Sequence, residues 1–132
     1  MSVLNLTSNI TFLYHEDLAA VRKFYEETLG LELVFNPGWA CVFRLNEKSF
    51  IGAVDAGSGS IKVESRGGVL ISLTVNNIEE VHTQLNGAFG VTNLSEIKKV
   101  KDISLKSFFF EGPDGYKYEI QQFTSGELQE LF

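Results

Sequence analysis

Apolar and polar positions follow two different periods along this chain. Residues 9–14 (NITFLY) are rich in β-branched and aromatic types, which predicts a strand. From Leu18 to Thr28 apolar side chains recur every three or four positions, which predicts an amphipathic helix. Asp17 is the expected N-cap of this helix, and Gly30 lies just beyond its end. Further short strands are predicted at 31–35, 39–45 and 50–54.

The same pattern returns 60 residues later in the chain. Leu13 falls on Leu73, and the cap Asp17 falls on Asn77. The second half is therefore predicted to hold a strand at 69–75, a helix at 78–85 beginning after Asn77, and a closing hairpin of 104–110 and 116–123 around Pro113-Asp114-Gly115. A β-α-β-β-β unit thus occurs twice, and this internal repeat is the strongest signal of organisation in the sequence.

The repeat predicts one domain over residues 1–132, built of units at 9–57 and 67–123. The joint AGSGS at 56–60 is expected to lead into a short strand and then Arg66-Gly67-Gly68. In the tail, 124–132, three apolar residues share one side of a short helix, which would dock on the body, dock on a second subunit, or fray: Leu128, Leu131 and Phe132.

Charge and composition exclude several classes of partner. The net charge is −6, and the densest cationic run is the short Lys98–Lys101 stretch, expected to be a solvated loop or a strand edge. Nucleic acid and anionic membranes are therefore not expected as partners. A single cysteine, Cys41, excludes an internal disulfide, and no run is long and apolar enough to span a membrane. We expect a cytoplasmic protein.

Two segments carry a family resemblance. Residues 15–33 (HEDLAAVRKFYEETLGLEL) and 110–120 (FEGPDGYKYEI) resemble the characteristic helix and closing hairpin of the vicinal-oxygen-chelate superfamily, with Gly112 in place of the usual Asp. That superfamily includes glyoxalase I, bleomycin-resistance proteins and extradiol dioxygenases. The resemblance implies an α+β fold in which two βαβββ units form a curved mixed sheet that lines a cleft.

The resemblance also implies where a metal would bind in the metalloenzymes of the superfamily. Those positions map to Ile10 and Gly52 in the first unit and to Leu70 and Glu119 in the second. Only Glu119 has a donor atom, and one carboxylate does not hold a transition metal against water. His15 and His82 are expected at the surface or the edge of the sheet, away from such a site. We therefore expect no metal and no cofactor, as in the bleomycin-resistance proteins.

Strand alternation predicts which side chains share a face with Glu119. Lys117 and Gln121 lie on its strand at the same parity. Trp39, Cys41 and Phe43 are placed on the cleft side of their strand, although a one-residue error would exchange Cys41 for Ala40 or Val42. The predicted ligand-binding residues are Phe12, Tyr14, Trp39, Phe43, Phe50, Gly52, Leu70, Ser72, Glu119 and Gln121.

Glu119 has three interpretations on the sequence alone. It is a relic of a metal site, hydrogen-bonded to Tyr14 or a backbone donor; or it orients a ligand; or it is the general base of a metal-free lyase or isomerase. The corresponding functions are a protein that binds a small aromatic or amphiphilic molecule, a metal-free enzyme, and a sensory or interaction module whose cleft is filled by its own Phe side chains. We expect a homodimer, because open sheets leave edges that need cover and because the family resemblance implies one.

Overall fold

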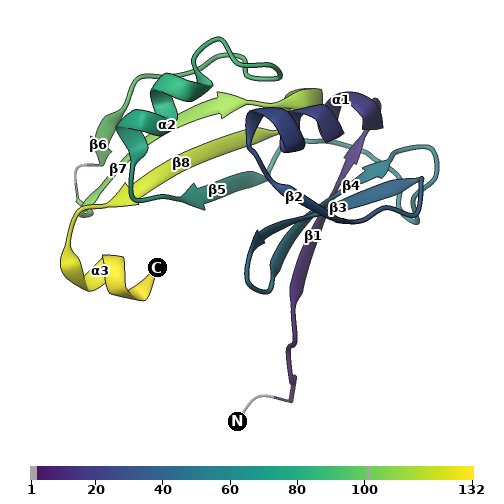
Figure 1. Cartoon of the computed structure of the whole chain (residues 1–132), viewed down its shortest axis with the longest axis horizontal. Coiled ribbons are helices and arrows are strands. Elements are labelled where there is room, and N and C mark those ends of the chain that lie inside the picture. The colour runs from purple at the N-terminus through teal and green to yellow at the C-terminus, as the bar shows by residue number, and fades with distance from the viewer. Residues whose placement is uncertain (1–2, 101) are drawn as a thin grey trace. The chain divides into compact units, whose positions relative to one another are not determined.

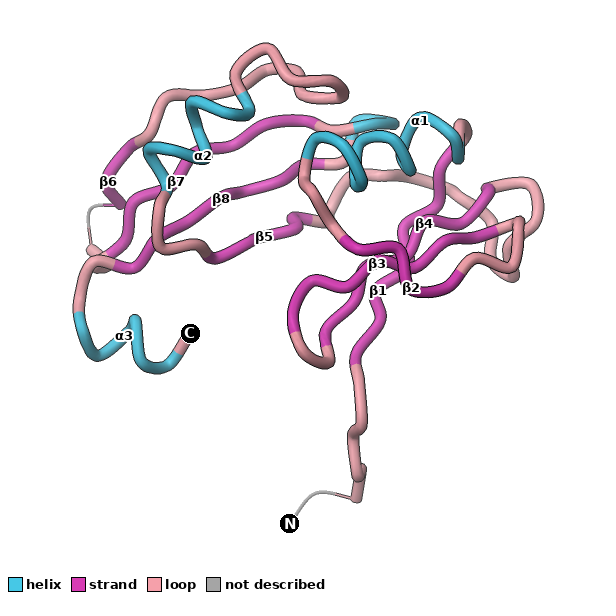
Figure 2. The backbone as a smooth tube through the Cα atoms, viewed as in Figure 1, coloured by secondary structure: helices cyan, strands magenta, loops and turns pink. Residues whose placement is uncertain are grey.

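The computed structural model describes residues 3–100 and 102–132, which form two compact units, Met1–Ser65 and Arg66–Phe132. Each unit holds one four-stranded sheet (Figures 1 and 2). The strand orders are β1-β4-β3-β2 and β5-β8-β7-β6, so the second sheet repeats the first, strand for strand. The predicted pair of βαβββ units is therefore confirmed, with β1 parallel to β4 and β5 parallel to β8.

The first unit begins with a strand that leads into a capped helix. Its elements are β1 (Asn9–His15), α1 (Leu18–Lys23), the π-helical turn η1 (Phe24–Thr28), β2 (Glu32–Phe35), β3 (Ala40–Asn46) and β4 (Ser49–Asp55). Asp17 caps α1 as predicted, because its Oδ1 accepts a hydrogen bond from the amide of Ala20 (3.0 Å). The predicted helix is α-helical only as far as Lys23, and its last turn is wider.

The second unit repeats this order with a longer loop after its helix. Its elements are β5 (Leu70–Thr74), α2 (Ile78–Leu85), β6 (Lys98–Val100), β7 (Leu105–Glu111), the 3₁₀ turn η2 (Pro113–Gly115), β8 (Lys117–Phe123) and α3 (Gly126–Leu131). The edge strand β6 is exposed along its length, as expected of this lysine run, and Lys101 lies outside the described residues.

Each sheet buries one face against its own helix. In the first unit Phe43 is fully buried and its ring lies 5.2 Å from that of Tyr25 in η1. In the second unit Tyr118 and Ile120 are buried, and His82 of α2 meets Phe108 edge-on at 4.8 Å. We call the face of each sheet that turns away from its helix the open face, because candidate ligand contacts lie there.

Three expectations about local structure need correction. No strand follows the joint, since residues 61–65 form neither helix nor strand. Asn77 does precede α2, but its side chain makes no cap bond, and Gln122 Oε1 accepts from the amide of Ile78 instead (3.0 Å). His15 was expected at the surface or edge and is fully buried, because β1 carries its last residues into the core.

The tail docks on its own unit rather than fraying. Ser125 caps α3 by accepting from the amide of Leu128 (3.3 Å). The ring of Phe132 stacks on that of Phe123 of β8, with centroids 4.9 Å apart. Within the part of the chain that the structure describes, no helix is long and apolar enough to cross a membrane.

Candidate ligand-binding site

The open face of the second sheet gathers the residues that alternation predicted around Glu119. On β5 the residues Leu70, Ser72 and Thr74 lie in register with Lys117, Glu119 and Gln121 of β8. Because neighbours in register point to the same face, these six side chains form two adjacent columns.

The polar pairs in these columns are joined by hydrogen bonds. Ser72 Oγ donates to Glu119 Oε1 (2.8 Å), and Gln121 Nε2 donates to Thr74 Oγ1 (2.9 Å). Glu119 therefore has a partner, but it is Ser72 and not Tyr14, which belongs to the other unit. Across the sheet, Phe109 of β7 lies directly opposite Glu119 and is 45% exposed.

A pocket of about 470 Å³ opens beside these residues, where β5 and β8 begin and β7 ends. This volume lies within the usual range for small-molecule sites. Its apolar lining includes Val69, Leu70 and Phe109, and its charged lining residues are Lys117 and Glu111. The Glu111 carboxylate also accepts a hydrogen bond from the side-chain amide of Asn93. This bond joins the loop that contains Asn93 to β7 at the pocket.

In the first unit, Phe12 fills the space that Gly52 leaves. The two residues are partners in the β1–β4 register, and a Cβ atom at position 52 would lie 2.4 Å from Cδ1 of Phe12. The Phe12 ring, 47% exposed, thus covers this part of the open face. Ile10 and Phe50 form the next pair on the same face, two residues along each strand from Phe12 and Gly52. The Arg44 guanidinium stands 5.2 Å from the centre of the Phe50 ring.

Tyr14 contributes to the core rather than to an open surface. It is packed with Ala40 and Val54, and Val63 packs against this cluster. The Tyr14 hydroxyl accepts a hydrogen bond from the amide of Ile61 (3.3 Å), so the segment that follows the joint covers it. The prediction that Tyr14 lines a ligand site is therefore wrong, because the chain that leaves the unit folds back over it.

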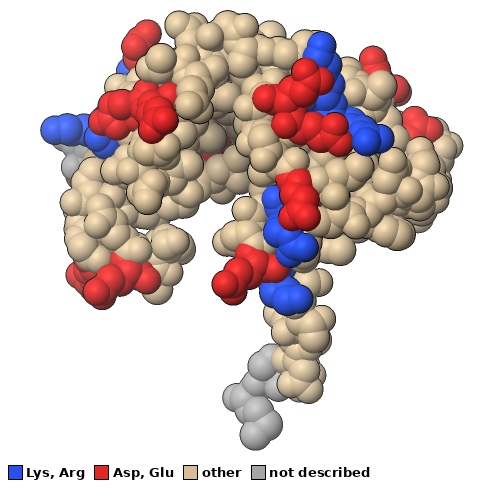
Figure 3. All heavy atoms as spheres, in the orientation of Figure 1, with Lys and Arg blue, Asp and Glu red and all other residues tan. Residues whose placement is uncertain are grey.

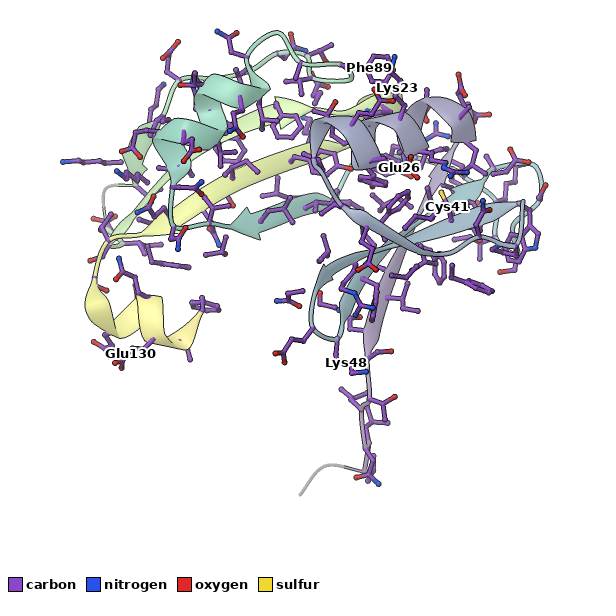
Figure 4. The ribbon with its side chains drawn as sticks, in the orientation of Figure 1. Lys23, Glu26, Cys41, Lys48, Phe89 and Glu130 are labelled. Atoms are coloured by element: carbon purple, nitrogen blue, oxygen red, sulfur yellow. The ribbon has the colours of Figure 1, made fainter. Side chains whose placement is uncertain are left out.

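Phe43 was also predicted to line the site, and it lies on the opposite face. It pairs with Ile51 and is buried against the helix side. Cys41 shares this side, where burial raises the pKa of its thiol, and Figure 4 shows its sulfur beneath the first helix. The alternative register, in which Ala40 or Val42 replaces Cys41 on the cleft side, is the one observed, since Val42 and Ala40 occupy the open face. Trp39 lies just before β3 and is 51% exposed. It stands an even number of positions before Phe43, so alternation assigns it to the helix side as well.

The residues at the four mapped metal positions do not fit a transition metal. Ile10, Gly52 and Leu70 bring no donor atom, and Glu119 is hydrogen-bonded to a serine. Across residues 3–100 and 102–132, no group of three or more His, Cys, Asp or Glu residues could hold an ion. The four mapped positions therefore offer a single carboxylate, which is too few donors for a transition metal.

Sequence reasoning left out two residues that the geometry brings to the site. Phe109 is one of three consecutive phenylalanines, 108–110, and its pairing with Glu119 places it on the open side. Lys117 was placed on the face of Glu119, but the pocket that it lines is formed together with loop residues such as Asn93. Alternation on β7, counted back from the turn at Pro113, was the signal that could have found Phe109.

Comparison with known proteins gives one family and many similar folds. A family model, Glyoxalase/Bleomycin resistance protein/Dioxygenase superfamily, matches residues 7–120. Among curated proteins, no sequence matches this chain significantly.

Similar solved structures include a glyoxalase/bleomycin resistance protein/dioxygenase from Nocardioides, with a TM-score of 0.74 and 18% identity over 95% of this chain and 88% of that one. Lactoylglutathione lyase from Agrobacterium tumefaciens has a TM-score of 0.71 and 18% identity, covering 96% of this chain and 98% of that one. Fosfomycin resistance protein FosX from Mesorhizobium loti has a TM-score of 0.67 and 14% identity, covering 98% of this chain and 100% of that one. At these identities the likeness concerns the fold alone.

Proposed function

This chain belongs to the glyoxalase/bleomycin resistance protein/dioxygenase superfamily, and from that premise we propose that it binds a small aromatic or amphiphilic molecule without a metal ion. The observation that carries the proposal is the largely apolar pocket of the second unit, with the Glu119–Ser72 pair beside it. Apolar walls with a few convergent polar groups are the usual profile of a small-molecule site.

The apolar part of the site supports a ligand with a flat or hydrocarbon portion. Leu70 is 52% exposed and Phe109 is 45% exposed, although both stand on a sheet whose other face is buried. Covering such side chains with a ligand is favourable in proportion to the apolar area removed from water. A good stack on the Phe109 ring adds on the order of 1 kcal/mol.

The polar part of the site supports a ligand with a donor group at one end. Ser72 occupies Glu119 Oε1, while no hydrogen-bond partner within 3–100 and 102–132 is assigned to Glu119 Oε2. That oxygen is available to accept from an amine or hydroxyl of the ligand. The carboxylate thus orients the ligand, and Ser72 holds it in place.

We include two further features in the proposal. The protein acts in the cytoplasm, where its buried, unpaired Cys41 stays reduced. It forms a homodimer, because β1 and β2 in one sheet and β5 and β6 in the other have unpaired edges within their own units.

The test is a ligand screen followed by a substitution at Glu119. Compounds are screened by the shift in melting temperature and by nuclear magnetic resonance of Phe109 and its neighbours. Glu119→Gln removes the charge but keeps the shape, and it should weaken binding about tenfold or more, because a hydrogen bond to a charged group contributes about 1.5–3 kcal/mol. The exposed Glu96→Gln, in the same unit, is the matched control and should bind as the parent does.

Other outcomes distinguish the remaining functions. If Glu119→Gln changes the melting temperature and leaves affinity alone, Glu119 is a structural relic. If affinity survives and turnover of a bound compound disappears, the protein is a metal-free lyase or isomerase with Glu119 as its base. A screen without any hit favours the module that fills its own cleft, and stoichiometric zinc, nickel or iron that is lost on Glu119→Gln contradicts the absence of a metal.

A further inference from the structure

We propose a second ligand site in the second unit, suited to a neutral, hydroxyl-rich small molecule such as a sugar. It is a pocket of about 660 Å³ between the end of β8, the turn from β5 into α2, and α3. Figure 1 shows α3 beside the end of β8, from which it continues. This pocket shares no lining residue with the pocket beside Leu70, Phe109 and Lys117.

Side-chain amides from two different elements converge on the pocket. Gln122 of β8 uses its Oε1 to accept from the amide of Ile78 (3.0 Å), and no partner within the described ranges is assigned to its Nε2. Gln129 of α3 donates its Nε2 to the carbonyl of Phe123 (2.8 Å). Its Oε1 therefore remains as an acceptor. The protein contacts hold both side chains in place while one polar atom of each is left for a ligand.

The turn between β5 and α2 adds two more amides. Asn77 donates its Nδ2 to Glu80 (3.3 Å), which leaves its Oδ1 as an acceptor. Asn76 has no side-chain hydrogen bond assigned within residues 3–100 and 102–132. The pocket therefore offers both donors and acceptors, each from a neutral group. A hydroxyl group also donates and accepts, so several hydroxyls on one molecule match this set better than an ion does.

An aromatic surface completes one wall. Phe132 covers the ring of Phe123 with one of its faces, at an interplanar angle of 15°, and is itself 70% exposed. Both rings line the pocket, so they form an apolar part of its wall. A sugar ring carries C–H groups on its faces and hydroxyls around its rim, so it can rest on this apolar surface while the amides bind its hydroxyls.

The charges around the pocket argue against an anionic ligand. Carboxylates stand in the first turns of the two helices: Glu79 and Glu80 in α2, of which Glu79 is paired with Lys106, and Glu127 in α3. Figure 3 shows acidic side chains gathered on the outer side of α3, and Figure 4 places Glu130 there. The carboxylates of Glu80 and Glu127 disfavour an anionic ligand, whereas a neutral molecule is not repelled.

The experiment is a titration of the full chain, labelled with ¹⁵N, with glucose, galactose, mannose, N-acetylglucosamine and maltose. We expect at least one of them to shift the side-chain amide signals of Gln122, Gln129 and Asn76 in a saturable way. Gln129→Leu and Phe132→Ala should each weaken that binding about tenfold or more. Glu130→Gln, on the outer side of the same helix, should not change it.

Asn76→Ala keeps the test independent of α3, because it removes an amide from the turn and should weaken binding even if the helix tolerates no substitution. The amide spectrum of each variant shows whether its fold is retained. The proposal is overturned if none of the sugars shifts these signals saturably, if sulfate shifts them equally well, or if the Asn76 and Gln129 variants bind sugar as the parent does.

Discussion

Gly52 and Phe12 form a matched pair on the open face of the first sheet. Gly52 is buried although it has no side chain, because the ring of Phe12 lies across it. The ring is itself half-exposed, so it can turn away if something larger occupies position 52. The Phe12 ring therefore covers part of the open face of the first sheet. This is what a module whose cleft is filled by its own Phe side chains requires, but among the described residues we find this contact in the first unit only.

Replacing Gly52 with alanine should destabilise the protein through this contact. The new Cβ would lie 2.4 Å from Cδ1 of Phe12, so the ring must move. Overpacking of this kind costs about 1–3 kcal/mol. Urea unfolding should show that loss in the parent background and much less in a Phe12→Ala background, where the obstacle is gone.

Gly57→Ala serves as the control, since its Cβ would meet only Asp55, at the ordinary distance of 3.8 Å. An equal cost of Gly52→Ala with and without the Phe12 ring would show that the strain lies elsewhere.

The two helices at equivalent places in the repeat begin in different ways. Asp17 caps α1 with its own side chain. At the equivalent position Asn77 turns toward Glu80, and a glutamine from β8 satisfies the first amide of α2. The N-terminus of α1 is thus capped by its own preceding residue, whereas the N-terminus of α2 is capped by a side chain from the distant strand β8.

We therefore expect different costs for the two equivalent substitutions. Asp17→Ala should lower the free energy of unfolding by about 1 kcal/mol, the usual loss for an N-cap. Asn77→Ala should cost clearly less, and Gln122→Ala should cost about 1–3 kcal/mol because it leaves the amide of the buried Ile78 without its partner. Urea unfolding of the three variants measures this order, and equal losses for Asp17→Ala and Asn77→Ala would contradict it.

The two units share a strand order but present different surfaces. The second unit carries the polar Glu119–Ser72 pair and the two pockets described above. The first unit has exposed apolar residues at its β2–β3 hairpin. Phe35 is 62% exposed and Trp39 is 51% exposed, and β2 is the outer strand of its sheet. An unpaired edge with large apolar side chains is a surface that association would cover.

Sedimentation equilibrium at tens of micromolar should accordingly give twice the 14.7 kDa mass of one chain. Phe35→Lys should shift the balance toward monomer, because it places a charge on the exposed edge strand. Lys48→Ala, at the β3–β4 turn labelled in Figure 4, is the control and should leave the mass unchanged. A parent protein that sediments as a monomer would refute the dimer, and a variant that remains dimeric would place the interface elsewhere.

The amino-acid sequence alone determined the elements and their repetition. Helical and alternating periods are local properties, so α1 taken together with η1, α2 and most of the strands could be placed to within one or two residues. The match of Asp17 with Asn77 and of Leu13 with Leu73 then revealed the repeat without any knowledge of contacts. Glu119 and its neighbours on β8 were assigned to one face for the same reason.

Only the tertiary structure decided which face each strand buries and what covers it. Alternation shows that Phe43 and Val42 point to opposite faces of the sheet, but it does not show which face is buried. The contact of Phe43 with Tyr25 of η1 identifies the buried face. Tyr14 has the right parity for an open face, yet the segment after the joint covers it through the amide of Ile61, which lies 47 residues away in sequence. Long-range contacts of this kind depend on how the chain returns on itself, and no local period encodes them.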